Sequence, residues 1–274
     1  MTSEPQHDLH RSPPVTLREI RQRWPWLAPV ALALFALLGL AAATHGGAAL
    51  VWDGPITRAF VALRSPAVDR VALWVSRLGS TPVVFAAGAA GIALAARRCR
   101  SVALVMLVTV TARPLVEWIV KELVARPRPT GARLVAGTGF SYPSGHVLAA
   151  AATWGFVPLI AALYVRRRWL WWMLTVLSWV IVVSVAWSRV WLGVHWTSDV
   201  VGGLALAFGA LSVAEAAIDS IDRRHRRPPD RSRGREADLG EDPVAVASGR
   251  MDLDLVAHAG FDELARDGEA GAVR

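Results

Sequence analysis

Residues 169–187 read WLWWMLTVLSWVIVVSVAW, nineteen consecutive positions without a charged side chain. An α-helix needs about 20 predominantly apolar residues to cross a bilayer, so this run predicts a membrane span. Five further apolar runs occur along the chain, at 27–44, 81–96, 101–120, 145–165 and 197–217. The sequence therefore predicts an all-α integral membrane bundle of six transmembrane helices, of which 81–96 is the shortest.

The charged residues agree with this topology. Apolar residues make up 54% of the chain, and its formal net charge is +8. The arginines form clusters beside alternate spans, at Arg18, Arg21 and Arg23, at Arg97, Arg98 and Arg100, at Arg166 to Arg168 and at Arg223 to Arg227. Cytoplasmic loops of membrane proteins carry such an excess, so we expect both termini in the cytoplasm. The basic composition thus reflects topology and does not indicate nucleic-acid binding.

The spans define the predicted domain organisation. Residues 24–221 form the six-span domain, and residues 1–23 and 222–274 are polar or highly charged tails that we expect to be disordered and cytoplasmic. The segment 45–80 has an amphipathic pattern that predicts a pair of helices lying at the membrane interface.

Two features near the first spans leave alternatives. The run at 27–44 resembles a signal peptide, but it exceeds the usual apolar region of about 7–15 residues, which favours a retained anchor. Cys99 is the only cysteine, so an intrachain disulfide is excluded. In the sequence RRCR it is either lipidated or an inert thiol, and we favour the inert thiol.

Polar residues accumulate where the predicted spans meet the outer face. The groups are Lys121, Arg126 and Arg128, then Ser144 and His146, then Ser188 and Arg189, then His195 and Asp199. A single charge at a span end is usually a side chain that reaches the interface. Four groups on one face, opposite the arginine clusters, instead indicate a functional site.

Two of these groups favour binding of an anion. Prolines on both sides of Arg128 predict a stiff loop, while Lys121, the only lysine, projects from a helix end. Arg126 is expected to be a solvated loop charge. In PSGH at 143–146, Ser144 can cap the next helix, and Gly145 lets a ligand approach the free N–H groups there. His146 is either incidental or chemically active.

The stretch SRVWLGVHWTSD at 188–199 is the most informative. His195 and Asp199 are four residues apart, so a helix starting near residue 197 places the carboxylate beside the imidazole and fixes its tautomer. Arg189 supplies a planar cation suited to phosphate oxygens. We expect Trp191 and Trp196 to lie at the membrane interface.

The same residues also suggest a metal site. His146, His195 and Asp199 are potential ligands, but the nearby cations Lys121, Arg128 and Arg189 would repel a divalent ion. We therefore expect phosphoryl-transfer chemistry without a metal or other cofactor.

These motifs resemble those of the type 2 phosphatidic acid phosphatase superfamily. That pattern is a lysine, six residues and Arg-Pro; then Pro-Ser-Gly-His; then Ser-Arg, five residues, His, three residues and Asp. The sequence matches it at Lys121, Arg128 and Pro129, at Pro143, Ser144, Gly145 and His146, and at Ser188, Arg189, His195 and Asp199.

The resemblance implies a six-helix lipid phosphatase that forms a phosphohistidine. It implies that His195 is the nucleophile, that Asp199 orients it, and that His146 is the acid and then the base. Residues binding the phosphate would be Lys121, Arg128, Ser144, Gly145 and Arg189. The enzyme would lie in the plasma membrane with its site on the extracytoplasmic face.

The motifs leave the substrate open. We favour polyprenyl (undecaprenyl) diphosphate. The alternatives are a phosphatidate, diacylglycerol-diphosphate or phosphatidylglycerophosphate phosphatase, a membrane protein that binds lipid phosphate without turnover and, more remotely, a vanadate-dependent haloperoxidase. The sequence predicts no oligomeric state.

Overall fold

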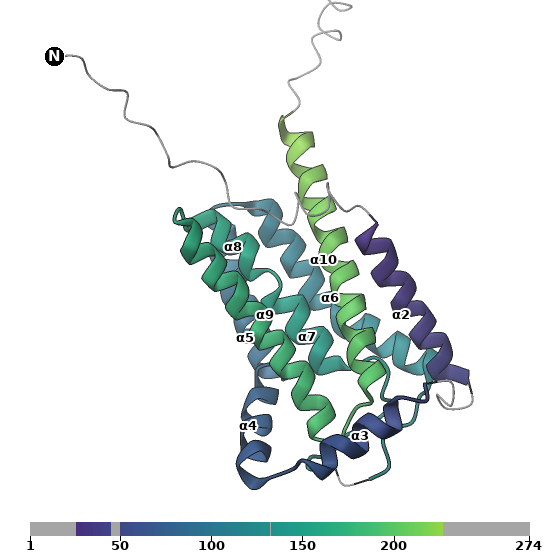
Figure 1. The fold of residues 1–274 in the computed structure, drawn as a ribbon. Helices are drawn as coiled ribbons and strands as arrows, with labels where there is room; N and C mark the ends of the chain where they lie inside the picture. The colour runs from purple at the N-terminus through teal and green to yellow at the C-terminus, as the bar shows by residue number, and fades with distance from the viewer. Residues whose placement is uncertain (1–25, 45–49, 132, 227–274) are drawn as a thin grey trace, which may run out of the picture. The chain divides into compact units, whose positions relative to one another are not determined.

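The computed structural model describes residues 26–44, 50–131 and 133–226, so both terminal tails lie almost entirely outside the described residues. Within these ranges the chain forms helices and no strand (Figure 1). They are α2 Leu27–Ala43, α3 Asp53–Ala62, α4 Pro66–Arg77, α5 Thr81–Ala96, α6 Arg100–Val124, α7 Gly145–Trp154, α8 Val157–Tyr164, α9 Arg168–Trp191 and α10 Thr197–Arg226. The last helix continues past the predicted start of the C-terminal tail at 222.

The helices account for the predicted spans only in part. Four stretches are long and apolar enough to cross a membrane: α6, α7 together with α8, α9, and most of α10. Helices α4 and α5, bent by 45° at their junction, make a fifth candidate if they form one span. Helix α2 is apolar but has only 17 residues, and α5 has 16. At 1.5 Å per residue, neither alone spans a hydrocarbon core of about 30 Å.

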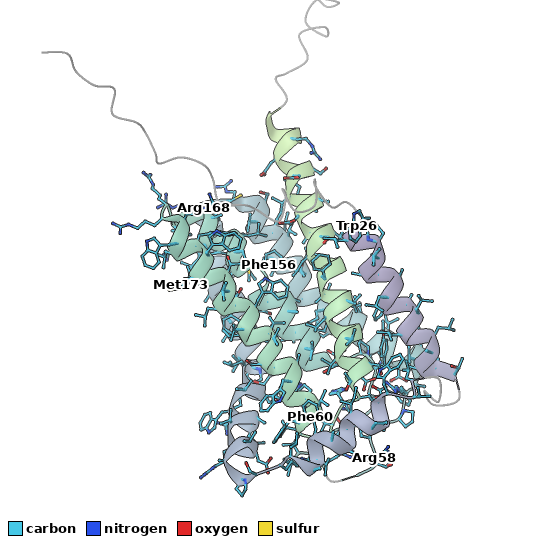
Figure 2. All side chains as sticks on the ribbon, in the orientation of Figure 1. Trp26, Arg58, Phe60, Phe156, Arg168 and Met173 are labelled. Carbon is cyan, nitrogen blue, oxygen red and sulfur yellow. The ribbon has the colours of Figure 1, made fainter. Side chains whose placement is uncertain are left out.

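The exposed surface of the bundle is apolar along several helices, as expected for a protein surrounded by lipid. Large apolar side chains project outward along the helices, including Leu104 on α6 and Val176 and Val183 on α9, each more than half exposed. In Figure 2, Met173 on α9 likewise points away from the bundle. Arg168, at the start of α9, lies at the end of the bundle opposite Arg58 and Phe60 on α3 (Figure 2). The exposed apolar side chains therefore lie between two ends of the bundle that both carry arginine.

Helix α7 is the centre of the packing. All its residues from Val147 to Thr153 are buried, and four of them are consecutive alanines. Small side chains let neighbouring helices approach closely, and α5, α6, α9 and α10 all pack against α7. The helix begins at Gly145, so the first turn of the most enclosed element carries His146.

The predicted span 145–165 is interrupted between α7 and α8. Pro158 lies in the first turn of α8, where it supplies no N–H group for a continuous helix. Gly155 lies at the break, and a Cβ atom there would be 2.4 Å from Leu211 Cδ1 of α10. The absence of a side chain at Gly155 therefore lets α10 approach closely at this point.

The segment 50–80 forms the predicted pair of helices, α3 and α4, close to the other end of α9 and to the start of α10 (Figure 1). Arg64, between them, donates two hydrogen bonds to Trp191 O, from Nε at 3.1 Å and Nη2 at 2.7 Å. Trp191 Nε1 donates to Asp69 Oδ1 at 2.8 Å. Trp191 is buried, so its expected place at the membrane interface is wrong; it ties α9 to α4 instead.

Candidate active site

The polar segments singled out in the sequence meet at the end of the bundle that carries α3. Backbone hydrogen bonds join them: Ser144 N donates to Asp199 O at 3.0 Å, Ser141 N donates to Arg126 O at 2.8 Å, and Leu134 N donates to Leu192 O at 3.1 Å. The loop 125–144 is thus bonded both to itself and to the α9–α10 connection. These segments therefore lie together at one end of the bundle.

A cavity of about 220 Å³ lies among these segments. Six of the predicted site residues line it: Lys121, Arg128, Gly145, His146, Arg189 and His195. The other lining residues are Gly79, Thr81, Arg113, Glu117, Ala136, Gly137, Thr138 and Ala149. Ser144 and Asp199 are fully buried and lie behind the cavity wall.

His195 is placed between the cavity and Asp199. Arg128 Nη1 lies 3.1 Å from His195 Nε2, and because a guanidinium can only donate, Nε2 accepts. The proton of the neutral ring is therefore on Nδ1, which faces Asp199 Oδ2 at 3.5 Å. At that distance the Asp199 carboxylate lies beside the ring but is too far away for a good hydrogen bond, and Nδ1 has no bonded partner among the described residues.

Asp199 is fixed by the start of α10. Its Oδ2 accepts from Trp196 N at 2.9 Å, which is the back-reaching half of a capping box. Its Oδ1 accepts from Arg126 Nη1 at 2.7 Å. The helix begins at Thr197, as the spacing of His195 and Asp199 predicts. The carboxylate beside the imidazole is thus bonded on both oxygens.

Arg126 is buried, and its expected role as a solvated loop charge is wrong. Its side chain is 2% exposed and lies between two carboxylates, with Nη2 2.7 Å from Asp53 Oδ2 and Nη1 bonded to Asp199. Nη1 also donates to Ser198 Oγ at 2.6 Å. Two buried carboxylates offset the cost of taking this cation out of water.

Asp53, the first residue of α3, completes this arrangement. Its Oδ1 accepts from Ser198 N at 2.9 Å, and its Oδ2 accepts from Ser198 Oγ. We call Asp53, Arg126, Ser198 and Asp199 the rear network. Sequence reasoning missed Asp53 and Ser198, because their partners are distant along the chain.

Arg128 has more partners than the sequence suggests. Its Nε donates to Gly139 O at 3.0 Å, its Nη2 to Thr138 O at 2.8 Å, and its Nη1 to Val194 O at 2.8 Å. These bonds shape the loop at the mouth of the cavity. Burial lowers the pKa of Arg128 below its usual value, while the Asp199 carboxylate opposes that shift.

Two other predicted phosphate ligands differ in how they are placed. Arg189 lines the cavity, and its Nη1 donates to Ser76 Oγ of α4 at 2.5 Å. Ser144 precedes α7, but its hydroxyl makes no cap bond and has no partner among the described residues, so the predicted cap is wrong. The α7 amide ends are left facing the site without a side-chain cap.

Three charges on one face of α6 form a second group, which we call the front cluster. Glu117 Oε2 accepts from Arg113 Nη1 at 2.7 Å, and Glu117 Oε1 accepts from Lys121 Nζ at 2.7 Å. All three residues line the cavity. Their spacing of four residues inside an apolar run was the signal that would have identified Arg113 and Glu117.

Burial decides the protonation of His195. Its pKa is lowered to about 4, chiefly because burial removes hydration; the Asp199 carboxylate opposes this shift, and Arg128 and Arg189 add to it. The ring is therefore neutral near pH 7, as a nucleophile must be. No group of three His, Cys, Asp or Glu side chains is arranged to bind a metal in the part of the chain that the structure describes.

Comparisons with known proteins identify relatives. A family model described as PAP2 superfamily matches residues 101–218. Phosphatidylglycerophosphatase B of Bacillus subtilis (strain 168) is 37% identical over 207 residues, which cover 71% of this chain and 97% of that protein. Undecaprenyl-diphosphatase of Sulfolobus acidocaldarius is 39% identical over 69 residues, 25% of this chain and 29% of that one.

A solved structure is also similar. It is the crystal structure of the first transmembrane PAP2-type phosphatidylglycerolphosphate phosphatase from Bacillus subtilis, with a TM-score of 0.60 and 30% identity. The match covers 74% of this chain and 98% of that one. The likeness therefore extends over nearly the whole of that relative.

Proposed function

The chain belongs to the PAP2 superfamily and is a membrane lipid phosphatase, and from that premise we propose that His195 transfers the lipid's phosphate to water. One observation carries the proposal: His195 has its Nδ1 toward buried Asp199 and its Nε2 toward a cavity lined by four cationic side chains. A neutral imidazole in that position is a nucleophile facing an anion-binding site.

In the first step, His195 Nε2 attacks phosphorus and the bond from phosphorus to the lipid oxygen breaks. His146, on the cavity wall, donates a proton to the leaving oxygen. The ring of His195 becomes positively charged, and the nearby Asp199 carboxylate stabilises that charge. In the second step His146 takes a proton from water, the oxygen attacks the phosphohistidine, and inorganic phosphate leaves.

The cations would stabilise the charge on the transferring phosphoryl group. Lys121, Arg128 and Arg189 all reach the cavity, as does the Gly145 end of α7. Arg128 Nη1 must exchange its bond to His195 Nε2 for a phosphate oxygen before attack. Ser144 is assigned a supporting role behind the wall, since its hydroxyl does not reach the cavity.

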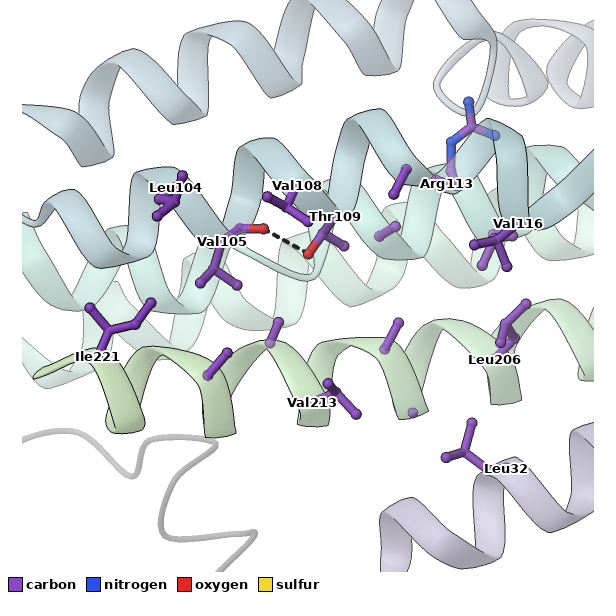
Figure 3. A pocket seen from close by; sticks show the side chains of 17 residues that line it. Leu32, Leu104, Val105, Val108, Thr109, Arg113, Val116, Leu206, Val213 and Ile221 are labelled. Atoms are coloured by element: carbon purple, nitrogen blue, oxygen red, sulfur yellow. Dashed lines mark hydrogen bonds between the residues drawn. The ribbon is translucent and has the colours of Figure 1, made fainter. Parts of the chain in front are cut away.

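A second pocket is suited to the hydrocarbon chain of the lipid. An apolar groove of about 560 Å³ runs between α6 and α10, and Figure 3 shows side chains from Leu104 to Val116 on one wall and from Leu206 to Ile221 on the other. Arg113 lines both the groove and the catalytic cavity. We assign the groove to the hydrocarbon chain of the substrate, whose phosphate then lies beyond Arg113.

Two substrates are candidates. Phosphatidylglycerophosphate is favoured by the relative that matches nearly over its whole length. Polyprenyl diphosphate, which we favoured among the substrates that the motifs leave open, is supported by the shorter match. Phosphate release from both lipids in detergent, with phosphatidate and diacylglycerol diphosphate beside them, tests the choice.

The assay carries its own controls. The highest kcat/KM identifies the substrate, and His195→Ala should show no release on any of these lipids. Activity should survive a chelator and be inhibited by vanadate, which mimics the phosphoryl group in transfer. Loss of activity with the chelator and recovery with a divalent ion would contradict a phosphohistidine mechanism.

The groove assignment is tested by narrowing it. Ala210→Phe places a ring in the groove, whereas Val201→Phe alters an exposed position of α10 outside it. Ala210→Phe should raise KM for a long-chain lipid phosphate and leave KM for a short, water-soluble one unchanged. An equal effect on both substrates would remove the groove from the proposal.

We also propose six crossings: the four longer spans, the bent α4–α5 pair, and α2, whose 17 residues would cross with local thinning of the bilayer. Both termini would be cytoplasmic, and the site would face outward in the plasma membrane. The arginine clusters support this orientation.

Two residues that occur once allow a direct test of orientation. Lys121 is the only lysine and lines the cavity, while Cys99 is the only cysteine and precedes α6 at its other end. On intact cells, an impermeant amine reagent should label Lys121, and an impermeant thiol reagent should leave Cys99 unmodified. The reverse pattern would place the active site in the cytoplasm.

A further inference from the structure

Glu117 is the only carboxylate that lines the catalytic cavity within the described ranges. It lies one helical turn from Arg113 and one from Lys121, and each of its oxygens is 2.7 Å from one of these cations. A negative charge is unexpected in a cavity that receives a phosphate. The mechanism proposed above gives roles to His146, His195 and the cations but assigns none to Glu117.

The position of this carboxylate is as informative as its charge. A Cβ atom added to Gly145 would lie 1.9 Å from Glu117 Oε1 and 2.7 Å from Oε2, so the carboxylate packs directly against the first residue of α7. The amide end of a helix attracts anions. Glu117 therefore occupies the place where Gly145 and Lys121 would otherwise meet a phosphate.

We propose that Glu117 is an internal counter-anion, which occupies part of the phosphate site in the free enzyme and is displaced when substrate binds. The inference rests on the proposed function, because it requires phosphate to bind beside Gly145. Displacement transfers Lys121 from the carboxylate to the phosphate. The reverse exchange, after hydrolysis, helps to expel inorganic phosphate.

A purely structural role makes the opposite prediction. If Glu117 only fixes the position of Lys121, its loss should loosen Lys121 and weaken phosphate binding. If it competes with phosphate, its loss should strengthen binding, because a like charge opposes the incoming anion. The sign of the change therefore separates the two roles.

The experiment compares Glu117→Gln with wild type, both full-length and purified in detergent. Inorganic phosphate and orthovanadate are the probes, and their binding is measured by calorimetry and as inhibition of turnover. We expect about tenfold tighter binding of both to Glu117→Gln, with kcat reduced by slower phosphate release. A burst of lipid product before steady state would show that release has become limiting.

Glu122→Gln is the matched control. Glu122 is exposed on the same helix and does not line the cavity, so this change removes one carboxylate from α6 without altering the site. Its binding constants should equal those of wild type. If Glu117→Gln does not fold, Glu117→Asp retains the charge but moves it back by one methylene, and a smaller tightening is expected.

Unchanged or weaker phosphate binding in the Glu117 variants, with normal turnover in wild type, would overturn the counter-anion inference and leave the proposed function intact. Failure of wild type to bind phosphate or vanadate and to release phosphate from any lipid would reject the proposed function, and the inference with it.

Discussion

The rear network and the front cluster both pair arginine with carboxylate at one end of the same bundle, yet they differ in how completely their side chains are buried. In the rear network Arg126, Asp53 and Asp199 are no more than 3% exposed and are joined by hydrogen bonds from three separate segments. In the front cluster the exposed fractions are 8% for Arg113, 17% for Glu117 and 19% for Lys121, and all three residues lie on α6.

This difference indicates what each group can do. An ion pair buried on every side is costly to break, because the remaining charge has no water to solvate it. A pair of neighbours on one helix, open to a cavity, contributes little to stability and can exchange partners. We infer that the rear network holds Asp199 in one position as long as the protein is folded. The ion pairs of the front cluster instead exchange partners in each catalytic cycle.

The largest effect is expected at His195, which faces the cavity with one nitrogen and the rear network with the other. His195→Ala should reduce kcat by on the order of 10⁴-fold or more, as loss of a nucleophile commonly does. It should also abolish the labelled phosphoenzyme, measured after mixing with radiolabelled lipid and quenching in an alkaline denaturant, because phosphohistidine is hydrolysed in acid. His146→Ala should slow turnover but still bind lipid. Label on the His195→Ala protein would assign the nucleophile elsewhere.

The next effect tests the rear network. Arg126→Met leaves the buried carboxylates of Asp53 and Asp199 without their cation and should lower the free energy of unfolding by about 3–5 kcal/mol. Thermal unfolding in detergent measures this, and kcat should fall by roughly 100-fold or more because Asp199 loses its orientation. Arg58→Met, at an exposed site on α3, is the control. Equal stability of the two variants would show that the rear network is dispensable.

The pH dependence of stability should come next in size. The pKa of His195 is about 4 in the folded protein, below its ordinary unfolded value of about 6.5, so the unfolded chain binds more protons between these values. The contribution of neutral His195 to the free energy of unfolding is therefore complete above pH 6.5. It is lost as pH falls toward 4, by on the order of 1–3 kcal/mol. Wild type should lose more thermal stability over this window than His195→Gln. Parallel curves would contradict the lowered pKa.

The smallest effect tests the front cluster. Lysine occurs once among 30 basic residues, at position 121, so Lys121→Arg keeps the charge but replaces a compact ammonium with a wider planar group. We expect about a tenfold loss of kcat/KM with unchanged thermal stability. Vanadate should protect Lys121 of wild type from amine reagents. Full activity of the variant, together with labelling indifferent to vanadate, would remove Lys121 from the site.

Sequence reasoning was accurate where the chemistry depends on local spacing. The interval from His195 to Asp199 predicts a helix starting at 197, and the convergence of the motif segments follows from the alternating direction of the spans. It was wrong for Arg126, because an arginine between a helix and a proline-rich loop is usually solvated. Its burial depends on Asp53, and no local pattern connects two residues 73 positions apart.

Other details of the site depended on packing that the sequence does not encode locally. The cap predicted at Ser144 is absent, since Ser144 N bonds to Asp199 O and the hydroxyl is buried without a partner. Glu117 could have been found from its spacing to Arg113 and Lys121. Its contact with Gly145 could not, because that contact depends on how α6 meets α7.

The bond between Asp53 and Ser198 joins positions 145 residues apart, and it has a consequence for biosynthesis. A ribosome delivers α3 and Arg126 long before α10, so a nascent chain with its earlier helices already inserted still lacks His195, Asp199 and Ser198, the second partner of Asp53. The hydrolytic centre is therefore assembled only when the last span arrives. Chains released early would stay inert toward the lipids around them, and separately expressed fragments split in a loop between α3 and α10 should become active only when they associate.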